Sequence, residues 1–513
     1  MKKKLSRRDF ARTSAASAAA VALPNVLFGS TSTVETTAPA KGAAVAKEVI
    51  QRGRFAPPPP NFAYGGDASS AVAEYRDSIA LAHAPAYQNQ GGTSAQPAPA
   101  IIRGWREGTT IPAEYYIDEK HYVSDERFLA RNLWFLADHE ARIPKAGDYF
   151  VFEFGHADSA IVLRDKAGAV KAFHNVCRHR GSRLCRHDED PAPKDARLSV
   201  KQLGSSGNTP VFRCPYHAWT YDLEGKLISA PNGMPGDFDM TQNGLRPCHI
   251  RTAEGFIFLN FSAGDAPDFD SVVKNFSNVA REYGTAQLKI AARIAAPTKA
   301  NWKLVLENFQ ECYHCAPAHR NLVTTHPFWD GLMPPEQRTR LATSLQRFIP
   351  PSKQQPAPAG GGMAPPGANL GGDILNVNFV SGTLDGKAAA PLLPGRTEWT
   401  HRSLLATTGW STGYIQCYDD HVAVARFTPR GVKSTDAELF WLVASDAKEG
   451  KDYQVEKITA LWDITYREDR WITENNHQGI ESGFYASGRY AAVETGPSRF
   501  ITWYMSEVVP AAD

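Results

Sequence analysis

The chain has 513 residues, more than one ordinary domain contains, so we expect at least two folded units. Hydrophobic residues make up 42% and charged residues 21%, which excludes wholesale disorder. The 56 basic residues nearly balance the 54 acidic ones, so no charge excess indicates a nucleic-acid partner. The sparse, odd set of cysteines argues against a disulfide scaffold and for thiols that are buried, metal-bound or incidental. The seven are Cys177, Cys185, Cys214, Cys248, Cys312, Cys315 and Cys417.

Residues 1–40 predict a targeting signal. Arg7 and Arg8 follow a lysine run and precede an alanine-rich, weakly hydrophobic stretch, which is typical of the twin-arginine export signal of bacteria. A small-x-small cleavage site lies at 38–40, and 28–30 is a competing boundary. The signal implies a periplasmic protein; the alternative is a cytoplasmic protein with a basic, disordered N-terminus. Beyond it, no run of roughly 20 apolar residues is present to cross a bilayer, so we expect the rest to be soluble.

The remaining sequence predicts an α+β protein in which a β-rich domain precedes an α+β domain. Residues 41–112 are rich in Ala, Pro, Gly and Ser and predict an extended tether. A Pro/Gly-rich insert at 350–372 predicts a mobile loop. Strands are expected at 149–154, 255–261, 422–427 and 439–443, and helices at 302–313 and 453–479.

Two short loops carry the ligands of an inorganic site. Cys177 and His179 form a C-x-H pair, and Cys214 and His217 form a C-x2-H pair after a gap of 34 residues. Structural zinc sites usually pair cysteine with cysteine and histidine with histidine, whereas a Rieske [2Fe–2S] centre has two cysteines on one iron and two histidines on the other. Because each loop supplies one ligand of each kind, the mixed pairing favours the Rieske centre.

The segment between the two loops is unusually long for such a motif. Its excess, residues 188–209, is polar and predicts a surface insertion. Cys185 and His187 lie close by and are competing ligands in principle, but this pair lacks a matching second loop.

A second pair of ligands follows in the helical region. His314 and His319 are five residues apart across Pro317, close to the end of the helix predicted at 302–313. One imidazole can leave the end of the helix while the other comes from the turn after it. Two histidines and one carboxylate form the facial triad of a mononuclear non-haem Fe(II), which leaves positions open for O2 and substrate. The pair therefore suits an iron site whose carboxylate need not be close in sequence, although two histidines near a helix end are more often structural.

Together these motifs resemble the catalytic α subunits of Rieske non-haem iron oxygenases. The resemblance rests on Cys-Pro-Tyr-His-Ala-Trp in the second loop and on Asn-Trp-Lys, Glu-Asn and Glu-Cys-Tyr-His-x4-His in the helical region, and it covers about residues 111–504. It implies a Rieske [2Fe–2S] domain at 148–262 and a helix-grip catalytic domain made of 113–147 and 263–513. It also implies a symmetric homo-oligomer, often a trimer.

The resemblance assigns further site residues. Asp469 matches the third iron ligand, an aspartate on a late helix, with Glu468 as the alternative and Asp463 as a weaker one. Glu311 matches an acidic residue that bridges the first iron histidine to a Rieske histidine of a neighbouring subunit. Asn308 is expected near the iron as a polar group that supports the ligands.

The two metals together imply an O2-dependent mono- or dioxygenase. Residues 360–362 are a glycine run in Pro-rich coil and lack the strand-turn-helix context of a nucleotide-binding loop. Electrons are therefore expected from a separate reductase, directly or through a ferredoxin, with NAD(P)H as the ultimate donor. The alternatives from other classes are a zinc-binding module and a Rieske electron carrier without oxygenase activity.

The substrate is expected to be a small aromatic compound or a methylated or quaternary amine. Motifs at 383–387, 390–393, 426–431 and 474–479 are nearest to the branch that contains glycine-betaine and related quaternary-amine monooxygenases, along with ring-hydroxylating dioxygenases. A quaternary ammonium group binds over aromatic faces. The candidate residues for this are Trp410, Tyr414 and Tyr418.

Overall fold

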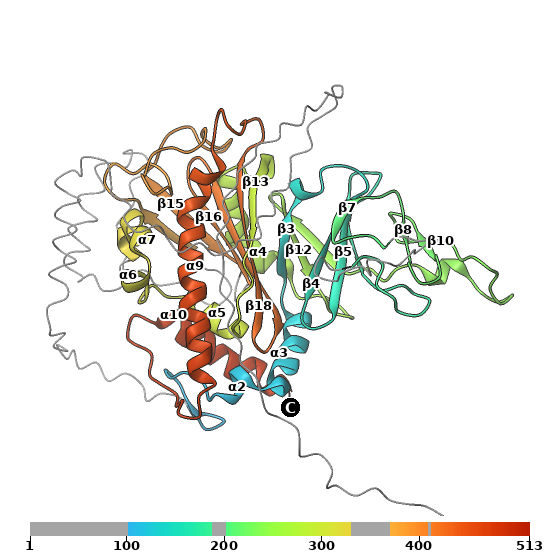
Figure 1. Cartoon of the computed structure of the whole chain (residues 1–513), viewed down its shortest axis with the longest axis horizontal. Coiled ribbons are helices and arrows are strands. Elements are labelled where there is room, and N and C mark those ends of the chain that lie inside the picture. The colour runs from blue at the N-terminus through green and yellow to red at the C-terminus, as the bar shows by residue number, and fades with distance from the viewer. Residues whose placement is uncertain (1–100, 187–201, 330–369, 409–411, 513) are drawn as a thin grey trace, which may run out of the picture. The chain divides into compact units, whose positions relative to one another are not determined.

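The computed structural model describes residues 101–186, 202–329, 370–408 and 412–512, all of which belong to one unit, Glu48–Asp513. Within these ranges, small antiparallel sheets in the first half of the chain precede a six-stranded antiparallel sheet with helices in the second half (Figure 1). The predicted α+β class, with a β-rich part followed by a sheet with helices, is confirmed.

The elements largely follow the expected order. The strands are β1 Ile101–Ile102, β2 Trp105–Arg106, β3 Phe135–His139, β4 Asp148–Phe154, β5 Asp158–Arg164, β6 Val170–His174, β7 Ser206–Asn208, β8 Phe212–Arg213, β9 Thr220–Tyr221, β10 Leu227–Ser229, β11 His249–Ala253, β12 Phe256–Asn260, β13 Leu288–Ala295, β14 Leu370–Ile374, β15 Arg402–Thr407, β16 Gly413–Cys417, β17 Val422–Gly431 and β18 Ser434–Ala444. The α-helices are α2 Glu114–Ile117, α3 Glu119–Asn132, α4 Phe269–Glu282, α5 Trp302–Phe309, α6 Cys315–Ala318, α7 Arg320–Thr325, α9 Val455–Ile480 and α10 Thr495–Trp503.

Strand β4 separates two hydrophobic cores because its side chains alternate between two faces. Phe150, Phe152 and Phe154 are buried in the core shared with the second half of the chain. Tyr149 faces the opposite way, into a smaller core that contains the cysteines of the two predicted cluster loops. Two sheets contribute side chains to this smaller core: a four-stranded sheet with the order β6-β5-β4-β7 and a three-stranded sheet with the order β10-β9-β8. The cluster loops are therefore held by a core of their own.

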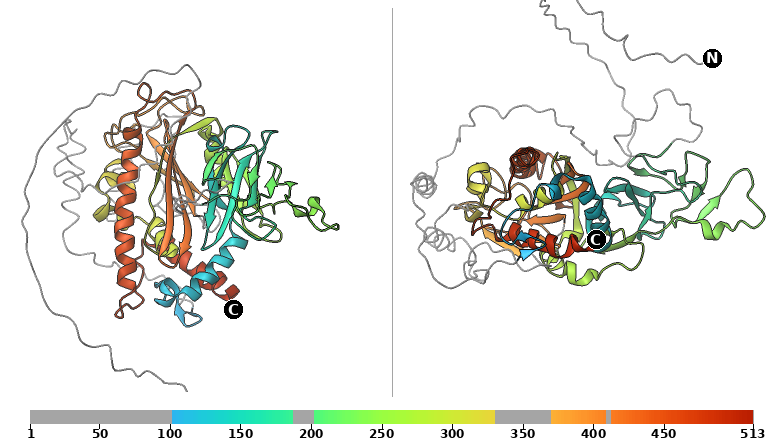
Figure 2. Two further views of the ribbon diagram at one scale, coloured as in Figure 1. Left: turned by 45° about the vertical axis from the view of Figure 1, so that its right-hand side comes forward. Right: turned by 90° about the horizontal axis from the view of Figure 1, so that it is seen from below.

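The six-stranded sheet has the order β13-β18-β17-β16-β15-β14 and is covered on both faces. Along β17, Val422 and Val424 pack into the same core as α4, whereas Ala423 and Ala425 belong to the core that includes α5 and α9. Two views show α9 running along its face of the sheet (Figures 1 and 2). The small alanines therefore lie on the sheet face that carries the two helices.

The helix predicted at 453–479 is confirmed as α9. Its buried side chains recur every three or four residues, as expected for one face of an α-helix. They include Ile458, Leu461, Trp462, Thr465, Tyr466, Asp469, Thr473, His477 and Ile480. No helix in the described ranges combines the length and the apolar composition needed to cross a bilayer.

The helix predicted at 302–313 is α5, which ends earlier than expected, at Phe309. Its start is fixed by Asn301, whose side chain accepts the Lys303 N–H at 3.1 Å and so satisfies a free amide of the first turn. Because α5 stops at Phe309, the chain leaves the helix there, and His314 lies at the start of α6 rather than at the end of a continuous helix.

The tether prediction is wrong at its C-terminal end. Within 101–112, β1 and β2 form a hairpin, and Trp105 and Ile111 are buried in the main core. The Thr110 N–H donates to the Gly488 carbonyl at 2.9 Å. The composition of 101–112 predicted a tether because the contact with Gly488 joins segments that are far apart in the sequence, and composition carries no signal of it. The predicted signal at 1–40 and the tether up to residue 100 lie outside the described residues.

Both predicted insertions are also partly structured. Of 188–209, the last residues form β7, which pairs with β4, and of 350–372, the last three belong to β14 at the edge of the six-stranded sheet. Residues 188–201 and 350–369 of the two insertions lie outside the described ranges. The predicted domain boundary at residue 148 places β3 in the catalytic domain and β12 in the Rieske domain. In the structure these two strands pair with each other, so the boundary divides one sheet.

Candidate active site

The two cluster loops are built alike. The N–H groups of Cys177 and Cys214 each donate to the carbonyl five residues later, at 2.8 Å in both loops. The residue four positions after each cysteine, Gly181 or Ala218, has a left-handed backbone with φ of 79° or 59°. The strained conformation at Ala218, which favours glycine, indicates that the second loop is held in this shape by its surroundings.

The four predicted cluster ligands separate into a buried pair and a less buried pair. Cys177 and Cys214 are buried, and the hydrogen bond between their sulfurs lowers the pKa of Cys214 while it raises the pKa of Cys177, so the two thiols share one proton and the thiolate lies on Cys214. The rings of His179 and His217 lie 4.6 Å apart at the more exposed edge, and Trp219 stacks on His179. This arrangement has the two-and-two ligand division of a Rieske cluster.

A single zinc ion fits these four residues less well. Zinc binding needs four donor atoms around one point. Among the described residues, the cysteines and histidines of the loops do not form a group of three donor atoms close enough to hold one ion. The predicted choice of cluster over zinc therefore agrees with the geometry.

Cys185, the predicted competitor, is held by backbone contacts instead. Its N–H donates to the Asn175 side chain at 2.9 Å, and its carbonyl accepts from the same side chain at 2.8 Å. Burial raises the pKa of its thiol well above the usual value, which disfavours the thiolate. His187 lies outside the described residues.

Replacing Cys214 with alanine is expected to remove the visible absorption of the cluster, because one iron would lose a thiolate ligand. Cys185→Ala is the matched control, since it removes another buried thiol of the same core, and it is expected to keep the spectrum. Absorption spectra of the two purified variants make the comparison. A full cluster spectrum in Cys214→Ala would contradict the assignment of this loop.

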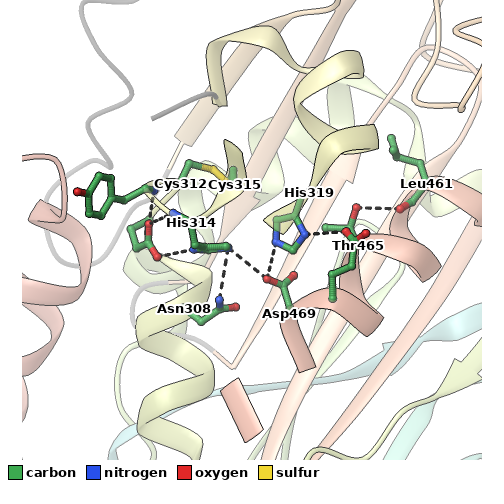
Figure 3. A network of polar contacts seen from close by, with 11 residues as sticks. Asn308, Cys312, His314, Cys315, His319, Leu461, Thr465 and Asp469 are labelled. Carbon is green, nitrogen blue, oxygen red and sulfur yellow. Dashed lines mark hydrogen bonds and ion pairs between the residues drawn. A yellow bond between two sulfur atoms is a disulfide. The ribbon is translucent and has the colours of Figure 1, made fainter. Parts of the chain in front are cut away.

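The iron site predicted from the sequence is assembled in space. His314, His319 and Asp469 each offer one ligand atom within 4.8 Å of the others, and they come from the ends of α6 and from α9 (Figure 3). One carboxylate oxygen of Asp469 lies 3.2 Å from His314 Nε2 and 2.8 Å from His319 Nε2. Two imidazole nitrogens and one carboxylate form the donor set of a facial triad.

Carboxylates on the outer side of each ring fix its orientation. Glu311 accepts from His314 Nδ1, and Glu468 lies 2.8 Å from His319 Nδ1. An ionised carboxylate can only accept, so each Nδ1 carries a proton and each Nε2 is directed at Asp469. This is the usual arrangement around metal-binding histidines, in which an outer carboxylate fixes the tautomer.

The electrostatics of the site favour a cation. Burial lowers the pKa of both histidines, but hydrogen bonds to carboxylates outweigh it and raise both values to about 9: His314 donates to Asp469 and Glu311, and His319 to Asp469 and Glu468. Burial raises the pKa of Asp469, but its two histidine partners hold it below the usual value. The three side chains therefore stabilise positive charge between them, and the residues present fit a divalent iron.

The alternatives for the third ligand lie elsewhere. Glu468 contacts the outer nitrogen of His319, as described above, and its side chain is 35% exposed. Asp463 pairs with Arg467 one turn along the helix, at 3.0 Å. Only Asp469 among the three lies in the buried stripe of α9. Asn308 Nδ2 is 3.4 Å from His314 Nε2, close to the site as expected.

Two features of this region were missed from the sequence. One is the contact of Glu468 with His319, for which the sequence offers no signal. The other is a disulfide between Cys312 and Cys315, which encloses His314 (Figure 3). The prediction of unpaired or metal-bound cysteines is wrong for this pair, and the C-x2-C spacing would have indicated that the two can reach each other.

The candidate aromatic residues lie on the helix-covered face of the sheet. Tyr414 stacks on Phe309 with ring centroids 4.4 Å apart, and the charge of Asp469 contributes to its raised pKa, after burial. The Tyr418 hydroxyl accepts from Trp462 Nε1 at 3.0 Å and lies 2.9 Å from His326 Nε2. Tyr414 is thus next to the iron site, while the hydroxyl of Tyr418 is hydrogen-bonded within the core. Trp410 lies outside the described residues.

Comparison with known proteins identifies the family. The family model of the Rieske [2Fe-2S] domain matches residues 133–242, and that of the ring hydroxylating alpha subunit catalytic domain matches 285–508. The oxygenase subunit of glycine betaine monooxygenase from Pseudomonas aeruginosa (strain UCBPP-PA14) is 30% identical over 414 residues, 80% of this chain and 91% of the relative. The chain belongs to the Rieske oxygenase α subunits. The corresponding subunit from Chromohalobacter salexigens is 31% identical over 422 residues, 82% of this oxygenase subunit and 91% of the relative.

Solved structures agree on the fold. A quaternary ammonium Rieske monooxygenase has a TM-score of 0.57 at 19% identity, covering 78% of this α subunit and 95% of that chain. Naphthalene 1,2-dioxygenase from Rhodococcus sp. has a TM-score of 0.53 at 20% identity, covering 78% and 94%. At these identities the likeness establishes the shared architecture.

Family membership confirms the predicted chemistry. Rieske oxygenase α subunits hold a [2Fe–2S] cluster and a mononuclear iron, and they use O2 with electrons that a separate reductase takes from NAD(P)H. The zinc module and the electron carrier without oxygenase activity are therefore wrong alternatives. The protein is an oxidoreductase that acts with O2 on a small organic substrate.

Proposed function

We propose that this α subunit removes an N-methyl group from a quaternary or methylated amine. The observation that carries the proposal is the 30% identity to glycine betaine monooxygenase oxygenase subunits over nine-tenths of their length. Further support comes from Phe309 and Tyr414, whose stacked rings lie next to the iron site. Aromatic faces beside a carboxylate attract a quaternary ammonium group.

The reaction balances as a monooxygenation. One oxygen atom of O2 enters a C–H bond of the methyl group, and the other leaves as water with two electrons from the reductase and two protons. The resulting N-hydroxymethyl group breaks down to formaldehyde and the demethylated amine. Bound at its site, the iron supplies O2 activation, while the protein binds and orients the amine and excludes water.

We assign the ligands residue by residue. Cys177, His179, Cys214 and His217 hold the cluster, and His314, His319 and Asp469 hold the mononuclear iron. Glu311 and Glu468 keep the Nδ1 protons of the two iron histidines in place, so that both Nε2 lone pairs face the metal. Asn308 adds a polar group beside His314.

The proposal includes a homo-oligomer, with a trimer favoured. Glu311 would link iron ligand His314 of one subunit to cluster ligand His217 of its neighbour, through hydrogen bonds to both imidazoles. Support comes from the geometry of Glu311, which already holds His314, and from a solved quaternary ammonium monooxygenase for which inter-subunit electron transfer is described. The immediate donor to the cluster is the reductase itself or a ferredoxin.

The test of the proposed substrate class is the ratio of products to O2. Purified protein with a surrogate reductase and NADH is supplied with glycine betaine, carnitine or an aromatic acid such as benzoate. The proposal predicts one formaldehyde and one demethylated amine per O2 with a methylated amine, and none of these products with benzoate. Hydroxylated benzoate in the absence of any demethylation would contradict it.

Export of the folded protein by the twin-arginine route is also part of the proposal. Its support is Arg7 and Arg8 before a weakly hydrophobic stretch, because this route accepts proteins that already carry cofactors. Replacing both arginines with lysine is expected to leave the protein in the cytoplasm, which cell fractionation measures. Native protein found wholly in the cytoplasm with its N-terminus intact would contradict the export proposal.

A further inference from the structure

Among the described residues, the buried polar side chains without hydrogen-bond partners include Gln416 and Trp441, both on the helix-covered face of the sheet. Gln416 in β16 and Trp441 in β18 are both 0% exposed. Within the described ranges, neither the amide nitrogen nor the amide oxygen of Gln416 is hydrogen-bonded, and neither is the indole nitrogen of Trp441. Buried amide and indole N–H groups are normally paired, so both groups require an explanation.

The strand register brings the two side chains to one place. Gln416 pairs with Ala423 of β17, and Ala423 pairs in turn with Trp441, so the three residues form one row across the sheet. Directly paired residues point to the same face. The middle residue is alanine, whose methyl group reaches less far than either neighbour, so no bulky side chain of the row separates the amide from the indole.

This row lies beside the proposed active site. Tyr414 is two residues before Gln416 in β16 and points to the same face, about 6.8 Å along the strand. Tyr414 in turn stacks on Phe309, the residue after Asn308, and is influenced by the charge of Asp469. A small substrate whose reacting methyl group lies at the iron can therefore reach Gln416 with its other end.

The chemistry of the two groups defines what they bind. An indole N–H only donates, so the partner of Trp441 must be an acceptor, and the amide nitrogen of Gln416 can donate to the same group. Towards the iron, the site is instead lined by carboxylates and aromatic rings, which suit a cation. The site is thus polarised along the sheet face, with donors at one end and acceptors at the other.

We propose that Gln416 and Trp441 bind a carboxylate of the substrate while the ammonium group lies against Tyr414. The proposal rests on the proposed function for the position of the substrate and deepens it by naming a second group that the substrate carries. It makes Gln416 a residue that determines specificity, because an amine without the acceptor would leave both donors unpaired.

Thermal unfolding of the full-length holoprotein with four probes tests the proposal. Glycine betaine and tetramethylammonium differ by a carboxylate, and so do benzoate and benzene. The wild type is expected to be stabilised more by the carboxylate member of at least one pair. In Gln416→Leu this advantage is expected to vanish, with about tenfold weaker binding of the carboxylate probe by calorimetry. Without ligand, Gln416→Leu is expected to melt higher than the wild type, because an unpaired buried amide has been replaced by an apolar group.

The controls separate this inference from the proposed function. Ile415→Val changes the opposite face of β16 and is expected to keep the carboxylate advantage, and Trp441→Phe removes the N–H group and is expected to lose it. If only the benzoate pair shows the advantage and Gln416→Leu removes it, the carboxylate site at Gln416 and Trp441 holds, while the ammonium position at Tyr414 and the amine substrate are wrong. Equal stabilisation within both pairs in the wild type, an advantage that survives in both variants, or a lower melting temperature of ligand-free Gln416→Leu would overturn the inference.

Discussion

Replacing Asp469 with alanine is expected to remove the mononuclear iron and abolish turnover while the [2Fe–2S] cluster stays intact. One oxygen of its carboxylate lies against both His314 Nε2 and His319 Nε2. Two imidazoles alone hold divalent iron weakly, and the missing carboxylate also removes the charge that balances the metal. Iron content per chain, measured together with the visible spectrum of the cluster, reports both centres in one sample.

Glu468→Gln is the matched control for Asp469→Ala. It changes the adjacent carboxylate, which contacts His319 through Nδ1 and not through Nε2. Loss of such an outer contact typically costs roughly 10- to 100-fold in metal affinity or activity, so this variant is expected to load with iron when iron is in excess. Activity in Asp469→Ala together with loss of iron in Glu468→Ala would make Glu468 the third ligand.

Glu311→Gln is expected to keep both metals and normal reduction of the cluster but to lose roughly 10- to 100-fold in product formation. Among the described residues, the hydrogen bonds of the Glu311 carboxylate come from three donors: His314 Nδ1 on one oxygen, and the backbone N–H groups of Tyr313 and His314 on the other. A glutamine offers one acceptor oxygen and one NH2 group, so one of these donors must face another donor. The position of His314 and the proposed path to the neighbouring His217 are both disturbed.

Rapid mixing of the reduced protein with O2 and bound substrate measures this effect as the rate of cluster reoxidation. Glu494→Gln provides the control. Glu494 lies near Glu311 and His314, and its side chain accepts from the Ala491 N–H instead of an imidazole. The substitution therefore removes the same charge without changing a bond to His314. A reoxidation rate that is unchanged in Glu311→Gln would leave this residue without a role in electron transfer.

The proposed cluster ligands could be identified in the sequence because each loop is local. Four residues within two short turns define the chemistry, and the spacing alone separates a cluster from zinc. The third iron ligand is different, since Glu468 and Asp469 are both carboxylates at the expected place. The buried stripe of α9 separates them, because Asp469 continues the series Trp462 and Tyr466 whereas Glu468 does not. Helix phase was thus available in the sequence as a signal.

Other features depended on contacts between distant segments. Helix α5 was predicted to continue to Tyr313 because the sequence offers no breaker before Pro317. In the structure α5 ends at Phe309, and the carbonyl of Gln310 packs directly against Gly496, where any side chain would collide with it. The same holds for Gln416, whose unpaired amide is evident only once the strand register is known.

The central claim, that this chain is an oxygenase with two metal centres, is tested most directly with 18O-labelled O2. The reduced protein and a surrogate reductase are supplied with a panel of methylated amines and aromatic acids, formaldehyde is trapped as it forms, and the products are analysed by mass spectrometry. The account predicts one labelled oxygen atom in the formaldehyde released from a methylated amine. Consumption of labelled O2 with the label in peroxide or water alone, across the whole panel, would contradict it.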